Sequence, residues 1–173
     1  MAAQGFLARV AGRTKQILGI QVSAGAADAG KIAALDDSGR FDISMMPVGV
    51  GQATTNATAS EALAAGDFVN LYGNAGTWSA RKADNSNNRP ADGFVLAAVN
   101  NAATATVYPL DSPNTARSGL TIGADYWLGT AGGVTNTPLD ETSGANAGKI
   151  SQYLGKAKSA TELLTTDDAY VVL

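Results

Sequence analysis

Two aspartates are the residues whose type and setting come nearest to a catalytic pair. Asp67 and Asp125 both lie shortly after a glycine and at the start of a strand-like run. Two carboxylates in such positions can act as acid and base in glycan hydrolysis. Aspartates beside glycine turns also hydrogen-bond backbone amides, and the two sites are offset, since glycine directly precedes Asp67 but lies two residues before Asp125. We therefore predict structural roles for both and no catalytic residue.

Other candidate motifs also fall short of a binding site. Asp36, Asp37 and Asp42 offer carboxylates, but their spacing matches no calcium loop. The glycine-rich pieces 49–51 and 132–133 lack the Lys-Ser/Thr pair and the strand-to-helix setting of a phosphate loop. We therefore predict no metal and no cofactor. Four aromatic residues could stack on a sugar, although core positions are the commoner use of aromatics: Trp78, Tyr108, Tyr126 and Trp127.

The composition excludes most enzyme chemistry. The chain of 173 residues contains no cysteine and no histidine. Thiol nucleophiles, disulfides, imidazole or thiolate metal ligands and the commonest general base are therefore excluded. No apolar run approaches the roughly 20 residues needed to span a bilayer, and the start of the chain lacks the pattern of a secretory signal. We expect a soluble, non-enzymatic protein that is made in the cytoplasm and does not bind membranes.

Positive charge is concentrated at the start of the chain. The net charge is −3, yet the first 27 residues contain three basic residues and no acid, which leaves nine bases and fifteen acids, or −6, for the rest. Such asymmetry is typical of a basic arm that docks on an acidic partner. An acidic body repels phosphate, so we predict no nucleic-acid binding. The predicted partner-binding residues of this arm are Phe6, Leu7, Arg9, Val10, Arg13 and Lys15.

A repeated pattern organises the remainder of the chain. Residues 63–71 return as 120–128, with glycine three residues after the first leucine and five before the second in both copies. A glycine-containing apolar run and a closing strand-like segment follow each copy, at 93–99 and 105–108 and again at 153–157 and 169–173. Each copy has the pattern of a β-hairpin unit, which has too few strands to bury a face alone. The sequence therefore predicts an all-β fold in which two related units form a sandwich or barrel.

These patterns also predict boundaries and a core. We expect an N-terminal arm and a small extra hairpin over 1–52, a linker over 53–60, and a β body over 61–173 built from the units 61–110 and 118–173. Within 1–52 the pattern predicts an irregular arm over 1–16, a strand over 16–22, and a hairpin of 31–35 with 40–43; a helical turn is predicted over 61–65. The predicted core comprises Leu63, Phe68, Leu71, Phe94, Val107, Leu120, Leu128, Leu154 and Val171.

Several stretches resemble head decoration (capsid cement) proteins of tailed bacteriophages. The resembling stretches are 30–47, 59–70, 81–84 with 91–95, and 119–128 with Leu154-Gly155 and 159–163. The resemblance implies a structural virion protein on the outside of the capsid that binds the major capsid protein and bridges capsomers. On a capsid lattice we expect a homo-oligomer, a trimer rather than a dimer. The alternatives are a phage tail-fibre or glycan-binding β module and, behind it, a glycosidase that uses Asp67 and Asp125.

Overall fold

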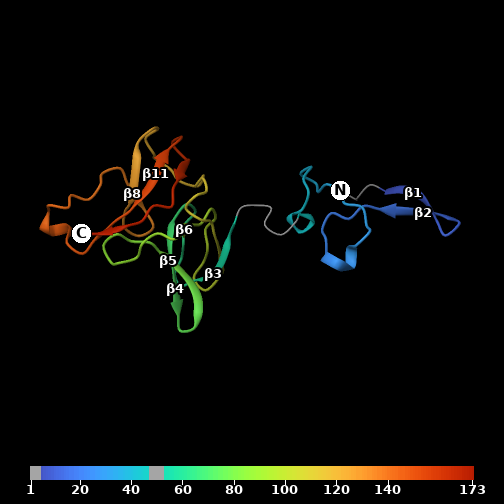
Figure 1. Ribbon diagram of the computed structural model, residues 1–173, viewed down its shortest axis with the longest axis horizontal. Coiled ribbons are helices and arrows are strands. Elements are labelled where there is room, and N and C mark those ends of the chain that lie inside the picture. The colour runs from blue at the N-terminus through green and yellow to red at the C-terminus, as the bar shows by residue number, and fades with distance from the viewer. Residues whose placement is uncertain (1–4, 47–52) are drawn as a thin grey trace. The chain divides into compact units, whose positions relative to one another are not determined.

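The computed structural model describes residues 5–46 and 53–173 and divides the chain into two compact units, Met1–Gly51 and Gln52–Leu173 (Figure 1). We call them the N-terminal and C-terminal units. The fold is all-β, as predicted, and the helical residues described belong to short 3-10 turns at Gly25–Asp28, Ile43–Met45 and Gly144–Asn146. Within the described ranges, no helix is long and apolar enough to span a bilayer.

The N-terminal unit begins with a β-hairpin in place of the predicted irregular arm. Strands β1 (Gly5–Val10) and β2 (Arg13–Leu18) pair antiparallel through a two-residue turn at Ala11 and Gly12. Both turn residues have positive φ, 51° and 79°, which matches the twist that two-residue hairpins need. Gly12, a residue type that weakens helices, closes this turn. The strand predicted over 16–22 lies earlier in the chain, at Arg13–Leu18. The first four residues of the predicted arm lie outside the described residues.

The hairpin predicted around Asp36 forms only its turn. The Asp36 amide donates to the Arg40 carbonyl at 2.8 Å, and the Asp36 carboxylate accepts from the amides of Ser38 and Arg40. The flanking segments do not pair with each other as strands. Instead the segment before the turn bridges to Ile20, whose carbonyl accepts from the Ala34 amide at 2.7 Å. The predicted hairpin was wrong because this flank takes an earlier partner.

A five-stranded sheet opens the C-terminal unit. Its order is β6-β4-β5-β3-β7, and a bridge between Phe94 and Tyr108 brings the end of β7 back to β6, so the sheet is a nearly closed barrel. All neighbours are antiparallel except β3 and β5. The bounds are β3 Thr55–Ala59, β4 Phe68–Asn74, β5 Thr77–Lys82, β6 Gly93–Phe94 and β7 Thr104–Val107.

Strand β3 replaces most of the predicted linker 53–60. It pairs with β5 on one side and β7 on the other, and Ala57 and Ala59 are 4% and 1% exposed. Two buried alanines fill space inside a narrow barrel, but an Ala and Thr pattern gives no hydrophobic alternation for a sequence to display. The helical turn predicted over 61–65 is also wrong, because Leu63 bridges to Val99 as an extended residue.

A four-stranded sheet, β12-β11-β8-β9, follows in the same unit. A two-stranded sheet of β10 and β13 accompanies it. The segment 169–173 was predicted to close the second repeat, but β12 closes it. Val171, which was predicted in the core, lies in β13 and is 60% exposed. The bounds are β8 Asp125–Leu128, β9 Val134–Thr135, β10 Ile150–Ser151, β11 Tyr153–Ala157, β12 Leu163–Thr165 and β13 Val171–Val172.

The two repeats share their backbone hydrogen bonds as well as their residue spacing. The Gly66 amide donates to the Val95 carbonyl at 2.7 Å, and the Gly123 amide donates to the Ala157 carbonyl at 2.8 Å. The strand registers match too, since Phe68 pairs with Phe94 as Asp125 pairs with Lys156, two residues after each glycine. The same order, hairpin then return strands, therefore recurs: β5-β4-β6-β7 and β9-β8-β11-β12.

One apolar cluster joins the two repeats. It contains Phe68 and Phe94 from the first repeat and Leu128 and Leu154 from the second, all at most 1% exposed. A second cluster fills the barrel, with Leu63 and Val107 at its buried positions and Leu71 half-buried at its edge. The predicted core was therefore correct except at Val171 and, in part, at Leu71. The first repeat thus fills its barrel with its own residues, and the two repeats share the other cluster.

Candidate interaction surface

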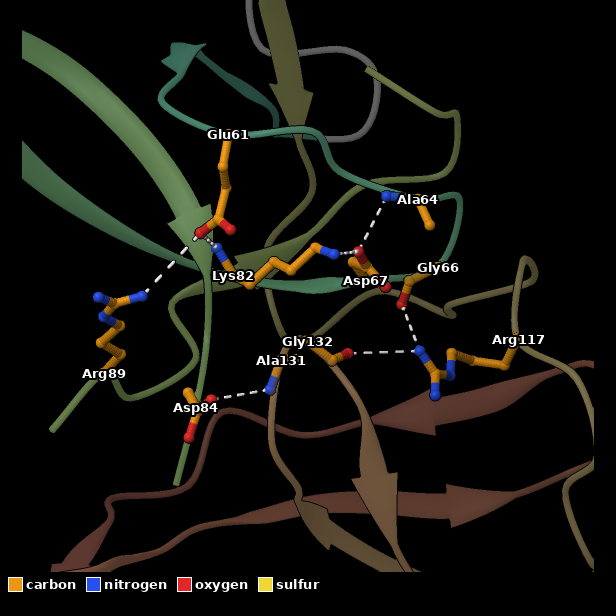
Figure 2. A network of polar contacts seen from close by, with 10 residues as sticks. All are labelled: Glu61, Ala64, Gly66, Asp67, Lys82, Asp84, Arg89, Arg117, Ala131 and Gly132. Carbon is orange, nitrogen blue, oxygen red and sulfur yellow. Dashed lines mark hydrogen bonds and ion pairs between the residues drawn. The ribbon is translucent and has the colours of Figure 1, made fainter. Parts of the chain in front are cut away.

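The first candidate catalytic residue, Asp67, closes a turn. It is 9% exposed, its carboxylate accepts from the Ala64 amide at 2.8 Å, and it lies 3.8 Å from the Lys82 ammonium (Figure 2). These contacts belong to the predicted structural role of an aspartate beside a glycine turn.

Arg117 crosses from the segment between the repeats to the same turn. Its guanidinium donates to the carbonyls of Gly66 at 3.0 Å and Gly132 at 3.4 Å, as Figure 2 shows, and lies 5.9 Å from the Phe68 ring centroid. Burial lowers the pKa of Arg117, and the charge of Asp67 acts in the opposite direction. The network therefore fastens the second repeat to the first. No sequence motif had singled out Arg117, which lies between the two patterns.

The second candidate, Asp125, has different partners. Its carboxylate lies 2.7 Å from the Lys156 ammonium and accepts from the Tyr153 hydroxyl at 2.8 Å. The hydrogen bonds from Lys156 and Tyr153 lower the pKa of Asp125, whereas burial and then the bond to Asp125 raise the pKa of Tyr153 to about 12. Asp67 and Asp125 thus stand at nearly equivalent places in two different repeats, each with its own partners.

The four aromatic candidates for a sugar-stacking platform also have separate surroundings, as the two aspartates do. Tyr126 is 6% exposed and Tyr108 stacks on Phe94 at 5.8 Å, so neither joins a surface platform with Trp78, which is 52% exposed. Trp127 meets Tyr153 edge to face. Among the residues with described placement, no three acidic, histidine or cysteine side chains gather as a metal site. The Asp42 carboxylate caps the 3-10 turn that follows it.

The N-terminal unit contains ten of the sixteen large apolar residues that are exposed in the described chain. None of its residues from 5 to 46 is buried, so the unit has no core of its own over the described range. Phe6, Leu7 and Val10 are 43%, 74% and 41% exposed, as a partner-binding arm requires. Met46, also expected from the sequence as an interface residue of this segment, is 40% exposed. Sequence reasoning missed a further group, because these residues follow no single period; they are Val22, Ile32, Leu35, Phe41 and Ile43.

The β1–β2 hairpin divides this surface into two chemistries. At its open end Phe6 lies opposite Ile17, and Leu18 opposite Gly5. Towards the turn the three predicted bases are exposed: Arg13, opposite Val10, and Lys15, opposite Ala8, lie on one face of the hairpin, and Arg9 lies on the other. No acid occurs between residues 5 and 18. A hairpin that is apolar at its open end and cationic near its turn suits a partner surface on which an apolar patch lies beside an acidic one.

The comparisons with known proteins add no constraint to this surface. No family model matches the chain, and no curated protein matches it either.

Proposed function

We propose that this protein decorates the outside of a tailed-bacteriophage capsid and stabilises the shell by bridging capsomers. In this proposal it is a non-enzymatic virion protein and the major capsid protein is its partner. The observation that carries the proposal is the N-terminal unit, in which a cationic hairpin and ten exposed large apolar residues surround no buried residue over 5–46. Exposed apolar area on this scale is typical of an interface.

The roles of the two units follow from their contrast. The C-terminal unit has two apolar clusters and a cross-repeat polar network, so it can fold around its own core. The N-terminal unit lacks such a core in its described residues and gains most from burial against a partner. When many copies make this contact on one shell, avidity allows stable attachment although each single contact is weak. A homo-oligomer, with three copies favoured over two, clamps more capsomer joints per particle.

Co-sedimentation with capsids that lack the protein tests the proposal. Wild type should bind, and deletion of residues 1–15 should abolish or strongly weaken binding because it removes β1 and the cationic tip. Changing Arg9, Arg13 and Lys15 together to glutamine should reduce binding most at low salt, where charge attraction is least screened.

The matched control removes the same charge from the other unit, by changing Lys149, Lys156 and Lys158 to glutamine. It should leave capsid occupancy near that of wild type, and circular dichroism should report an intact β fold for all variants. Wild-type occupancy by the deletion variant, or equal losses for the two triple variants, contradicts the assigned role of the hairpin. Absence of wild-type binding contradicts the function itself.

The second candidate function is a tail-fibre or glycan-binding module, and Trp78 is the observation that favours it. This indole is 52% exposed beside the β4–β5 turn, and the guanidinium of Arg81 lies 4.1 Å from the Tyr72 ring centroid on the same hairpin. An exposed aromatic can stack on a sugar. Binding to isolated host polysaccharide that Trp78→Ala removes would favour this function. Turnover of polysaccharide that Asp67→Asn and Asp125→Asn both remove would favour the glycosidase.

A further inference from the structure

The barrel of the C-terminal unit has an open seam beside β7. Its closing bridge is the pair Phe94 and Tyr108, whose amides donate to each other's carbonyls at 3.0 and 2.9 Å. Strand β6 ends at Phe94, so no strand of the described part of the chain lies opposite Thr104 and Thr106 on that side. In an antiparallel ladder alternate residues direct their amides and carbonyls to the same side. Thr106 and Thr104, two and four residues before Tyr108, therefore present theirs to the seam.

The second repeat shows what a closed seam looks like. There β12 pairs with β11 through three consecutive residues, Leu163 to Thr165, whereas β7 reaches β6 through one bridge. Five residues, 158–162, connect β11 to β12, but nine, 95–103, connect β6 to β7. The longer connection carries the chain away from the edge of β7. The open seam is thus a specific departure of the first repeat from an otherwise shared plan.

A groove of about 420 Å³ occupies this seam. Its walls are the segment 96–100 on one side and β7 with Tyr108 on the other, and none of its lining residues carries a charge. The volume lies within the roughly 300–1,000 Å³ typical of binding pockets. An uncharged strand edge without proline invites another strand, since natural edges are usually blocked by charge or proline. The groove therefore suits an extended segment with an apolar face.

Strand β1 is a segment of that kind. Within residues 5–46 and 53–173 it pairs with β2 alone, and a two-stranded hairpin is marginal in water without a third strand or a core. Phe6, Ala8 and Val10 alternate onto one face of β1, and in β2 this face continues with Lys15 opposite Ala8 and Arg13 opposite Val10. Strand β1 needs a further strand and a core, and the seam offers both an unpaired edge and apolar walls.

We infer that β1 of one copy adds as an extra strand to β7 of a second copy, with Phe6, Ala8 and Val10 turned towards the groove. The inference rests on the proposed self-association and names its contact. Charge favours it, because residues 5–18 carry +3 whereas residues 52–173 carry seven bases and eleven acids, or −4. The contact joins two different surfaces, so it is head-to-tail and generates a ring when the rotation closes. A ring of three copies is the closed form of this contact that corresponds to the proposed trimer.

Disulfide trapping in the purified full-length protein tests the contact. The chain has no cysteine, so each introduced thiol is unique. Ala8 lies on the same face of β1 as Phe6 and Val10, which is turned towards the groove, and Thr104 and Thr106 line the groove on the outer face of β7, so cysteines at these places would share a side. An Ala8→Cys copy mixed with a Thr106→Cys or Thr104→Cys copy should give a cross-linked heterodimer on oxidation.

Trp78→Cys is the matched control for random collision, because Trp78 is exposed on another strand. Mixing it with Ala8→Cys should give at least tenfold less cross-linked product. Equal cross-linking with Trp78→Cys overturns the inference. Failure of both β7 cysteines to cross-link, which docking of each hairpin onto its own chain would also produce, overturns it as well. The test needs no capsid, so its failure is distinct from a failure of capsid binding.

Blocking the edge gives a second readout. Thr104→Lys with Thr106→Lys should convert the oligomer to a monomer in sedimentation equilibrium, because edge lysines oppose strand addition. The pair Thr104→Val with Thr106→Val keeps the edge uncharged and should stay oligomeric. Both positions are exposed, so circular dichroism should match wild type. An oligomer that persists in the lysine variant, or wild type that is monomeric at high concentration, overturns the inference.

Discussion

The Gly66 carbonyl accepts hydrogen bonds from two side chains, and this redundancy predicts a non-additive pair of mutations. Asn114 is fully buried; its side-chain amide donates to Gly66 at 3.0 Å, and Arg117 donates to the same oxygen at 3.0 Å. Gly66 itself is buried, so a carbonyl that loses both donors has no access to water. Each single mutation leaves one donor in place.

The magnitudes follow from counting hydrogen bonds. Asn114→Ala also leaves the Ala116 amide without the oxygen that it reaches at 3.2 Å, so we expect a loss of about 2–4 kcal/mol. Arg117→Met removes a guanidinium whose burial already lowers its pKa, so its own cost should be about 1 kcal/mol or less. The double variant should lose about 1–3 kcal/mol more than the sum, which is the cost of an unsatisfied buried acceptor.

Urea unfolding followed by tryptophan fluorescence measures all four proteins of the cycle. The control cycle pairs Asn114→Ala with Arg89→Met, because Arg89 lies 4.0 Å from Glu61 and shares no acceptor with Asn114. That pair should add within about 0.5 kcal/mol. An additive Asn114 and Arg117 cycle would refute the redundancy at Gly66.

Two further predictions concern the second repeat. Gly155→Ala should destabilise the protein more than Gly123→Ala. Both glycines have positive φ, which costs an alanine about 1–2 kcal/mol. Only at Gly155 does the added methyl group also collide with a backbone atom, the Leu164 carbonyl oxygen. Equal losses in urea unfolding would show that this close approach is unimportant. In an ultraviolet pH titration Tyr153 should ionise at about 12, and Asp125→Asn should lower that pKa, because burial and the Asp125 bond both favour the neutral phenol. An unchanged titration curve would refute the bond.

The sequence could predict the repeats because their key positions are distinctive. Leucine and glycine at fixed spacing place Gly66 and Gly123 in equivalent turns, and Gly93 and Gly155 where a neighbouring carbonyl approaches too closely for a Cβ. Strand β3 escaped prediction because its buried residues are alanines. The β1–β2 hairpin escaped it because Gly12 weakens a helix and closes a two-residue turn equally well.

The candidate site was only partly predictable for a related reason. Exposure of Phe6, Leu7 and Val10 follows from an apolar arm too short to bury them. The open seam at β7 does not follow from any residue pattern, because it depends on a connection four residues longer than its counterpart in the other repeat. Asn114 and Arg117 lie between the repeats, where no periodicity marks them, and only the fold brings them to Gly66.

The place of β3 in the barrel determines how the protein carries mechanical load. The first strand of the C-terminal unit is β3, which begins at Thr55, so a pull along the chain from the N-terminal side loads this strand first. That strand is held on both sides, by β7 over Thr55–Thr58 and by β5 at Thr58 and Ala59. A pull along its axis shears both ladders at once, whereas an edge strand would unzip one bond at a time. In the proposed capsid role, an outward pull on the chain would therefore load both ladders of β3 together.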